Sequence, residues 1–177
     1  MGTAISREGL IRNALLNSTL TEELRDAEIE TLSRLVELRQ YKAGDVIEKP
    51  RENNYESSMR DTLMMLGSGE VEVTFITRGE TASLKLSEPG ELSAILGFVG
   101  GDVSQIGIGV IARTDCSLLM IDRRRFEGLL NGHPAIAYYV MRGMVRYVHG
   151  IVRRLNLQTV EMTNYLYAAR PMLQGRA

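Results

Sequence analysis

The stretch of the sequence best suited to holding a ligand is residues 89–112, PGELSAILGFVGGDVSQIGIGVIA. It begins with a Pro-Gly turn and passes through a short apolar run with small residues. A Gly-Gly-Asp loop then leads into a strand-like alternation. Glycine-rich turns beside the start of a short helix can form nests of backbone N–H groups that hold anions. We therefore predict that a ligand site lies in this stretch.

The rest of the sequence offers little catalytic or metal-binding chemistry. The chain has two histidines and one cysteine, and their wide spacing forms neither a metal-ligand cluster nor a nucleophile–base pair. We interpret His133 as a capping or surface residue, His149 as an ordinary interface histidine and Cys116 as buried and inert. The sequence thus predicts no enzyme, no metal and no cofactor.

Composition narrows the class of protein. The chain has 177 residues, of which 44% are hydrophobic and 24% charged, with a net charge of −1. These values fit a globular domain and give no overall attraction to nucleic acid or to an anionic membrane. The lone cysteine favours a reducing compartment, and the sequence has no signal peptide and no apolar run long enough to cross a bilayer. We expect a cytoplasmic protein.

The elements that would position the ligand site alternate short apolar runs with turns over residues 36–122. This pattern predicts an antiparallel jelly-roll barrel, a mainly β fold with flanking helices. Two amphipathic helices should precede it, the second capped by Asp26. The polar segment 49–60 is expected to form a surface loop.

A long helix is predicted after Pro134, following a short helix that ends at Asn131-Gly132. Apolar residues at alternating steps of three and four predict a coiled-coil seam between two chains, and a helix packed flat on its own barrel is the alternative. The predicted homodimer interface is Met141, Met144, Val148, Ile151, Leu155, Gln158 and Met162. The predicted divisions are a sensory domain at 1–132, a dimerisation helix at 133–166 and a flexible tail at 167–177.

Five short segments follow one another in a specific order and spacing: YKAGDVI at 41–47, DTLMMLGSGEVEV at 61–73, PGE at 89–91, VIA at 110–112 and LLMIDRRRF at 118–126. With the helices on either side, they resemble the cyclic nucleotide-binding domain. The resemblance is closest to the sensory half of the catabolite activator and fumarate-nitrate regulator proteins. It covers roughly residues 20–160, and the polar segment 49–60 looks like an insertion.

The resemblance implies a nucleotide-binding cassette after the Pro-Gly turn. In the family, a Gly-Glu pair holds the ribose, N–H groups of a small helix face the cyclic phosphate, and an Arg on the next strand neutralises it. Here the Gly position is Ala94, the Glu position is Ile95 and the Arg position is Ile106. The predicted pocket positions, listed together, are Ala94, Ile95, Leu96, Gly97, Ile106 and Gly107, with base contacts near Ile151 and Val152.

The charged contacts of the cassette are therefore missing from this sequence. We expect cyclic AMP and cyclic GMP to bind poorly unless Arg51 or Arg60 supplies the missing cation. The residues after Asn156 leave no room for a helix-turn-helix, so we expect no direct DNA binding by this chain. Three hypotheses follow: a dimeric regulatory domain with an unidentified small-molecule effector, a cyclic nucleotide-binding protein with a rearranged site, and a protein-interaction module with a collapsed pocket and a protein partner.

Overall fold

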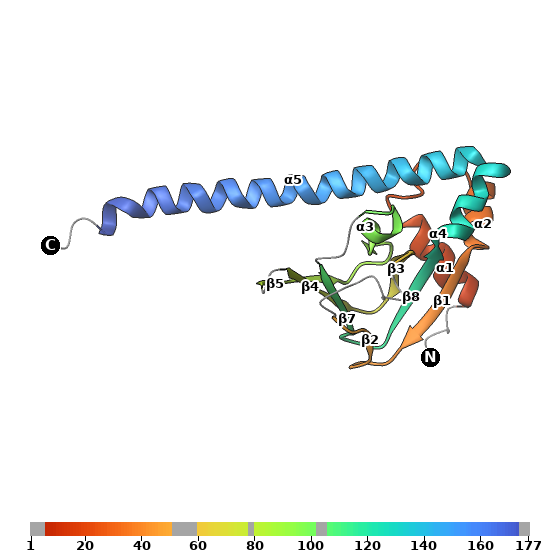
Figure 1. Ribbon diagram of the computed structural model, residues 1–177, viewed down its shortest axis with the longest axis horizontal. Coiled ribbons are helices and arrows are strands. Elements are labelled where there is room, and N and C mark those ends of the chain that lie inside the picture. The colour runs from red at the N-terminus through yellow and green to blue at the C-terminus, as the bar shows by residue number, and fades with distance from the viewer. Residues whose placement is uncertain (1–5, 51–59, 78–79, 102–105, 174–177) are drawn as a thin grey trace.

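The computed structural model describes residues 6–50, 60–77, 80–101 and 106–173, with backbone only for Leu155 and for 157–173. Figure 1 shows two layers of strands with helices along one side and a long helix that extends beyond the body. The helices are α1 (Arg7–Leu16), α2 (Asp26–Ser33), α3 (Ile95–Phe98), α4 (Arg123–Glu127), the 3-10 helix η2 (Gly128–Asn131) and α5 (Pro134–Leu173).

The strands form two antiparallel sheets. They are β1 (Val36–Tyr41), β2 (Val46–Glu48), β3 (Thr62–Ser68), β4 (Val71–Thr77), β5 (Glu80–Leu86), β6 (Leu92–Ser93), β7 (Gly107–Ala112) and β8 (Cys116–Asp122). One sheet has the order β1-β8-β3-β6 and the other the order β2-β7-β4-β5. The predicted mainly β fold with flanking helices is confirmed, with the strands in two sheets rather than one closed barrel.

The sheet containing β3 and β8 is buried on both faces. Along β3, Met64 and Leu66 belong to a core cluster shared with β4 and β7 of the other sheet. Their neighbours Leu63 and Met65 belong to a second cluster shared with α1, α2 and α5. Successive side chains of a strand point to opposite faces, so a strand with two buried faces needs a continuous apolar run. This is why β3 reads LMML without polar alternation.

The N-terminal helices differ in detail from the prediction. Ser6 caps α1 by accepting a hydrogen bond from the Gly9 amide at 3.1 Å. Asp26 is the first residue of α2 and not its cap, because Arg25 occupies the extended cap position. Glu28 supplies the capping contact instead, since its carboxylate accepts a hydrogen bond from the Arg25 amide at 2.8 Å.

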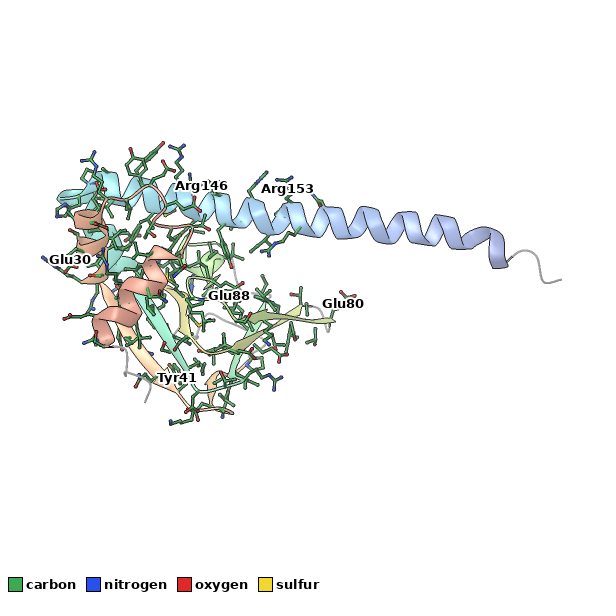
Figure 2. The ribbon with its side chains drawn as sticks, turned by 180° about the vertical axis from the view of Figure 1, so that it is seen from behind. Glu30, Tyr41, Glu80, Glu88, Arg146 and Arg153 are labelled. Atoms are coloured by element: carbon green, nitrogen blue, oxygen red, sulfur yellow. The ribbon has the colours of Figure 1, made fainter. Side chains whose placement is uncertain are left out.

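Helix α5 is longer than predicted and is fixed to the body at its N-terminal half. It continues past residue 166 to Leu173, so the segment predicted as a flexible tail begins inside a helix. Arg146 on α5 forms ion pairs with Glu22 and Glu23 in the connection before α2. Figure 2 shows Arg146 over the body of the molecule and Arg153 further along the helix. Within the described ranges, no helix is both long and apolar enough to span a bilayer.

Candidate functional site

The Pro-Gly turn at the start of the cassette is held by hydrogen bonds to β3 and by its own glutamate. The Gly90 amide donates to the Leu66 carbonyl at 2.8 Å. The Glu91 carboxylate accepts from the Ser87 and Glu88 amides at 2.8 and 3.0 Å. The Glu91 carboxylate thus closes the turn. Gly90 has a φ of +92°, and a Cβ there would lie 2.7 Å from the Asn17 carbonyl carbon of α1's C-terminal end.

Ala94 in the cassette adopts a backbone conformation that favours glycine. Ala94 has φ 62° and ψ 18°, in the left-handed region, and is the only described non-glycine residue with a positive φ. It precedes the four-residue helix α3. Gly97 in this helix packs directly against the chain before β3, since a Cβ on Gly97 would meet the Arg60 carbonyl oxygen at 2.4 Å. The Ala94 position is therefore strained. That Ala94 stands at the Gly position implied by the resemblance stays a prediction.

A cavity of about 180 Å³ lies between α3, the sheets and α5. It is bounded by residues from both sheets, from the cassette and from the middle of the long helix. Its wall consists of Glu48, Arg60, Met64, Phe75, Leu84, Leu92, Ser93, Ala94, Ile95, Leu96, Gly97, Ile106, Ile108, Val110 and Ile151. The pocket has therefore not collapsed, which disfavours the third hypothesis from the sequence.

Most of the residues predicted for the pocket lie on this wall. Ala94, Ile95, Leu96, Gly97 and Ile106 all line the cavity, as does Ile151 of α5. Gly107 does not. Gly107 is the first residue of β7, and Ile106 directly before it lines the cavity, as do Ile108 and Val110. Because successive residues of a strand face opposite sides, Gly107 faces away from the cavity. That these residues contact a ligand stays a prediction.

The sequence-based analysis missed the part of the wall that comes from the strands, namely Glu48, Met64, Phe75, Leu84, Ser93, Ile108 and Val110. The alternation along β7 was a usable signal, because every second residue from Ile106 faces the cavity. The contributions of β4 and β5 depend on sheet packing, which no local pattern gives. Arg51 and Arg60 were the two candidates for the missing cation. Arg60 lines the cavity, and Arg51 lies outside the described residues.

The charges around the cavity are poorly matched to a phosphodiester. Isoleucines stand at both positions where the resemblance implies charges, Ile95 and Ile106. Burying an anion without a counter-ion costs on the order of several kcal/mol. Glu48 is 6% exposed, lines the same cavity and takes part in another interaction. Arg60 is exposed and already takes part in another interaction. The cavity is therefore better suited to an uncharged ligand than to a phosphodiester.

Tyr147 joins the wall of the cavity to α5. Its hydroxyl accepts a hydrogen bond from the Leu92 amide at 3.1 Å and donates to the Leu92 carbonyl at 3.2 Å. Burial raises the pKa of the Tyr147 phenol above its usual value, which the Leu92 amide only partly offsets, so the phenol stays protonated and able to donate. One turn further along α5, Ile151 lines the cavity. The long helix is thus attached to the site at two neighbouring points.

The predicted dimer seam needs correction. Met144 is 2% exposed and packs in the core of its own chain, and Ile151 is half-buried and faces the cavity. Leu155, Gln158 and Met162 lie outside the residues whose side chains are described. Among the side chains of α5 that the structure describes, the exposed apolar residues form a stripe with Val145 and Val152 in place of Met144 and Ile151: Tyr138, Met141, Val145, Val148 and Val152. Only Met141 and Val148 belong to both sets.

The remaining residues singled out in the sequence show no site. Cys116 is 5% exposed, and burial raises the pKa of its thiol, so it is poorly placed to react. His133 and His149 are exposed. In the described part of the chain, no three His, Cys, Asp or Glu side chains gather at a distance suited to a metal ion.

Solved structures share this fold at low sequence identity. A cyclic nucleotide-binding domain from Methylobacillus flagellatus KT matches with a TM-score of 0.69 at 13% identity, over 92% of this chain and 87% of that one. The Thermus thermophilus catabolite activator protein matches with a TM-score of 0.59 at 22% identity, over 80% of this chain. The N-terminal domain of a Streptomyces coelicolor transcriptional regulator matches with a TM-score of 0.61 at 20% identity, over 78% of this chain and 94% of that one.

These matches confirm the fold of the predicted resemblance, the jelly roll of the cyclic nucleotide-binding domain. The chain spans 63% of the length of the Thermus protein. No family model matches the sequence, and no curated protein matches it either. Function must therefore be argued from the site.

Proposed function

We propose that this chain is a regulatory domain that acts as a homodimer and whose cavity does not bind cyclic AMP or cyclic GMP in the way usual for this fold. The observation that carries the proposal is the pair of isoleucines, Ile95 and Ile106, on the wall of a cavity that α5 also lines. A cavity attached to a long helix suits a sensor, because a ligand there can favour one helix arrangement over another. The lone thiol suits a cytoplasmic setting, as predicted.

The homodimer rests on the exposed stripe of α5. Its residues are spaced at steps of three and four, and Val145 at its centre is 67% exposed. An apolar stripe of this spacing is the seam of a two-stranded coiled coil. Among the residues that the structure describes, none covers most of Val145, and a second copy of α5 is the occupant that we propose. That this chain does not itself bind DNA, and that it is not an enzyme, stay predictions of the sequence.

Isothermal titration calorimetry with cyclic AMP and with cyclic GMP tests the nucleotide part of the proposal. For the natural sequence we expect no heat of binding at ligand concentrations up to about 1 mM, since an uncompensated buried anion gains little. The double variant Ile95→Glu with Ile106→Arg returns the ribose acceptor and the phosphate cation to the wall. We expect it to bind cyclic AMP at least tenfold more tightly than the natural sequence.

A second candidate is cyclic nucleotide binding through a rearranged site, favoured by the presence of Arg60 on the cavity wall. It predicts a micromolar dissociation constant for the natural sequence and its loss in Arg60→Ala. A micromolar constant would replace our first proposal with this one. Equally weak binding in the natural sequence and in Arg60→Ala would instead remove the second candidate.

A further inference from the structure

The wall of the cavity is mainly apolar. Eleven of its fifteen residues are apolar, and they come from β3, β4, β5, β6, β7, the cassette and α5. The polar groups are few: the carboxylate of Glu48, the guanidinium of Arg60 and the hydroxyl of Ser93. Ser93 is 6% exposed and lies on β6 beside Leu92. Ligand sites of this kind are mainly hydrophobic with one or two polar groups that fix orientation.

The size of the cavity limits the ligand. Its volume of about 180 Å³ is close to that of an engineered apolar cavity of about 150 Å³ that stays dry and binds benzene. A single aromatic ring with a small substituent fills such a space. A nucleotide, with base, sugar and phosphate, is larger than such a ring and carries a negative charge that Ile95 and Ile106 do not balance.

The entrance is also apolar. Leu84 of β5 is 40% exposed and Leu96 of α3 is 45% exposed, and both line the cavity. Isolated exposed leucines are ordinary, but these two border the same cavity, so its exposed rim offers apolar contacts to a ligand. A charged molecule following that path would lose its hydration and meet Ile95 and Ile106 where it needs counter-ions.

We propose that the effector of this domain is an uncharged, mainly apolar molecule about the size of a substituted aromatic ring. This rests on the proposed function, in that the cavity is the effector site of a regulatory domain. The ring packs among Ile106, Ile108 and Ile151, and the Ser93 hydroxyl accepts or donates the one hydrogen bond that a phenol or a ketone offers. Because Ile151 belongs to α5, the ligand contacts the long helix directly.

The test uses toluene as the probe and benzoate, the same ring with a negative charge, as its matched control. We expect near-saturating toluene to raise the Tm by about 2–4 °C and benzoate to leave it unchanged. In methyl NMR spectra, toluene should shift the resonances of Ile106, Ile108 and Ile151 and leave those of Val46 in place. Val46 is 52% exposed on β2 and lies outside the cavity wall.

Two variants locate the binding. Ile106→Arg brings a charge into the cavity and should weaken toluene binding at least tenfold, whereas Val46→Arg adds the same charge elsewhere and should not. Ile106→Phe fills the cavity without a charge and should also abolish binding, which keeps the test decisive if the arginine variant does not fold.

The ligand proposal is overturned if toluene changes neither the Tm nor the methyl resonances, or if benzoate binds as well as toluene. In either case a protein that remains dimeric and ignores cyclic AMP still meets the proposed function. Micromolar binding of cyclic AMP to the natural sequence has the opposite meaning, because it removes the proposed function and the apolar effector together.

Discussion

At the scale of single residues, the cassette combines a backbone conformation that favours glycine with apolar side chains on the cavity wall. Ala94 holds the left-handed conformation at φ 62°. Ile95 and Ile106 occupy the positions where the resemblance implies charges. The sequence alone identified these positions, because a short cassette between a Pro-Gly turn and a strand can be aligned by its spacing. It could not show that Ala94 keeps the glycine conformation, since φ depends on how α3 packs.

The strain at Ala94 predicts that Ala94→Gly stabilises the protein. A non-glycine residue in the left-handed region destabilises the folded state by about 1 kcal/mol or more. Glycine removes this strain, and its greater freedom in the unfolded chain offsets part of the gain. We expect the free energy of unfolding in urea to rise by about 0.5–1 kcal/mol. The matched control is Ala82→Gly on the exposed strand β5, where φ is not positive and glycine should lower stability by a similar amount. Equal effects of the two substitutions would contradict the assignment of strain.

At the scale of elements, the site depends on contacts that no single segment encodes. The sequence predicted the strands, both flanking sets of helices and the start of α5 at Pro134, because turns and periodicity are local signals. It assigned Met144 to the predicted seam, although Met144 is buried within its own chain. A buried face and an exposed face on one helix both show steps of three and four, so periodicity cannot say which is covered by the body. The wall contributed by Phe75 and Leu84 likewise needs the sheets to be assembled.

The hydrogen bonds between Tyr147 and Leu92 predict that Tyr147→Phe weakens the attachment of α5 to the cavity. The substitution leaves a buried amide and a carbonyl of Leu92 without this partner, so we expect a loss of about 1–2 kcal/mol in the free energy of unfolding. The control is Tyr138→Phe, since Tyr138 is 60% exposed and its variant should change stability by less than about 0.5 kcal/mol. A smaller loss for Tyr147→Phe than for the control would contradict the proposed link.

The same variant has a pH signature. The pKa of Tyr147 is raised in the folded protein, so folding favours the protonated phenol. Its contribution to stability is complete below the unfolded value of about 10 and is lost as the pH rises through the folded value. Urea unfolding from pH 8 to pH 11 should therefore show a steeper loss for the natural sequence than for Tyr147→Phe. Parallel curves would show that the phenol is not desolvated.

At the scale of the whole molecule, the exposed stripe on α5 predicts a homodimer that one charge can break. Val145→Glu places a carboxylate at the centre of the seam, where burial without a partner is strongly unfavourable. We expect the natural sequence to sediment as a dimer at about 20 µM and Val145→Glu to associate at least 100-fold more weakly, a difference of about 2.8 kcal/mol. Val46→Glu, at an exposed valine of β2, should remain dimeric. A natural sequence that sediments as a monomer would contradict the prediction.

Because α5 is long, a small tilt of the helix at Ile151 would move its C-terminal end by a larger distance. The helix continues from that residue to Leu173, and at 1.5 Å per residue this arm measures about 33 Å. In Figure 1 it extends well past the strands. With the cavity as pivot, a tilt of about 5° at Ile151 displaces the far end of the arm by about 3 Å. In the proposed homodimer, a small change in packing around a ligand in the cavity would thus become a larger displacement at the end of α5, which the partner helix would have to follow.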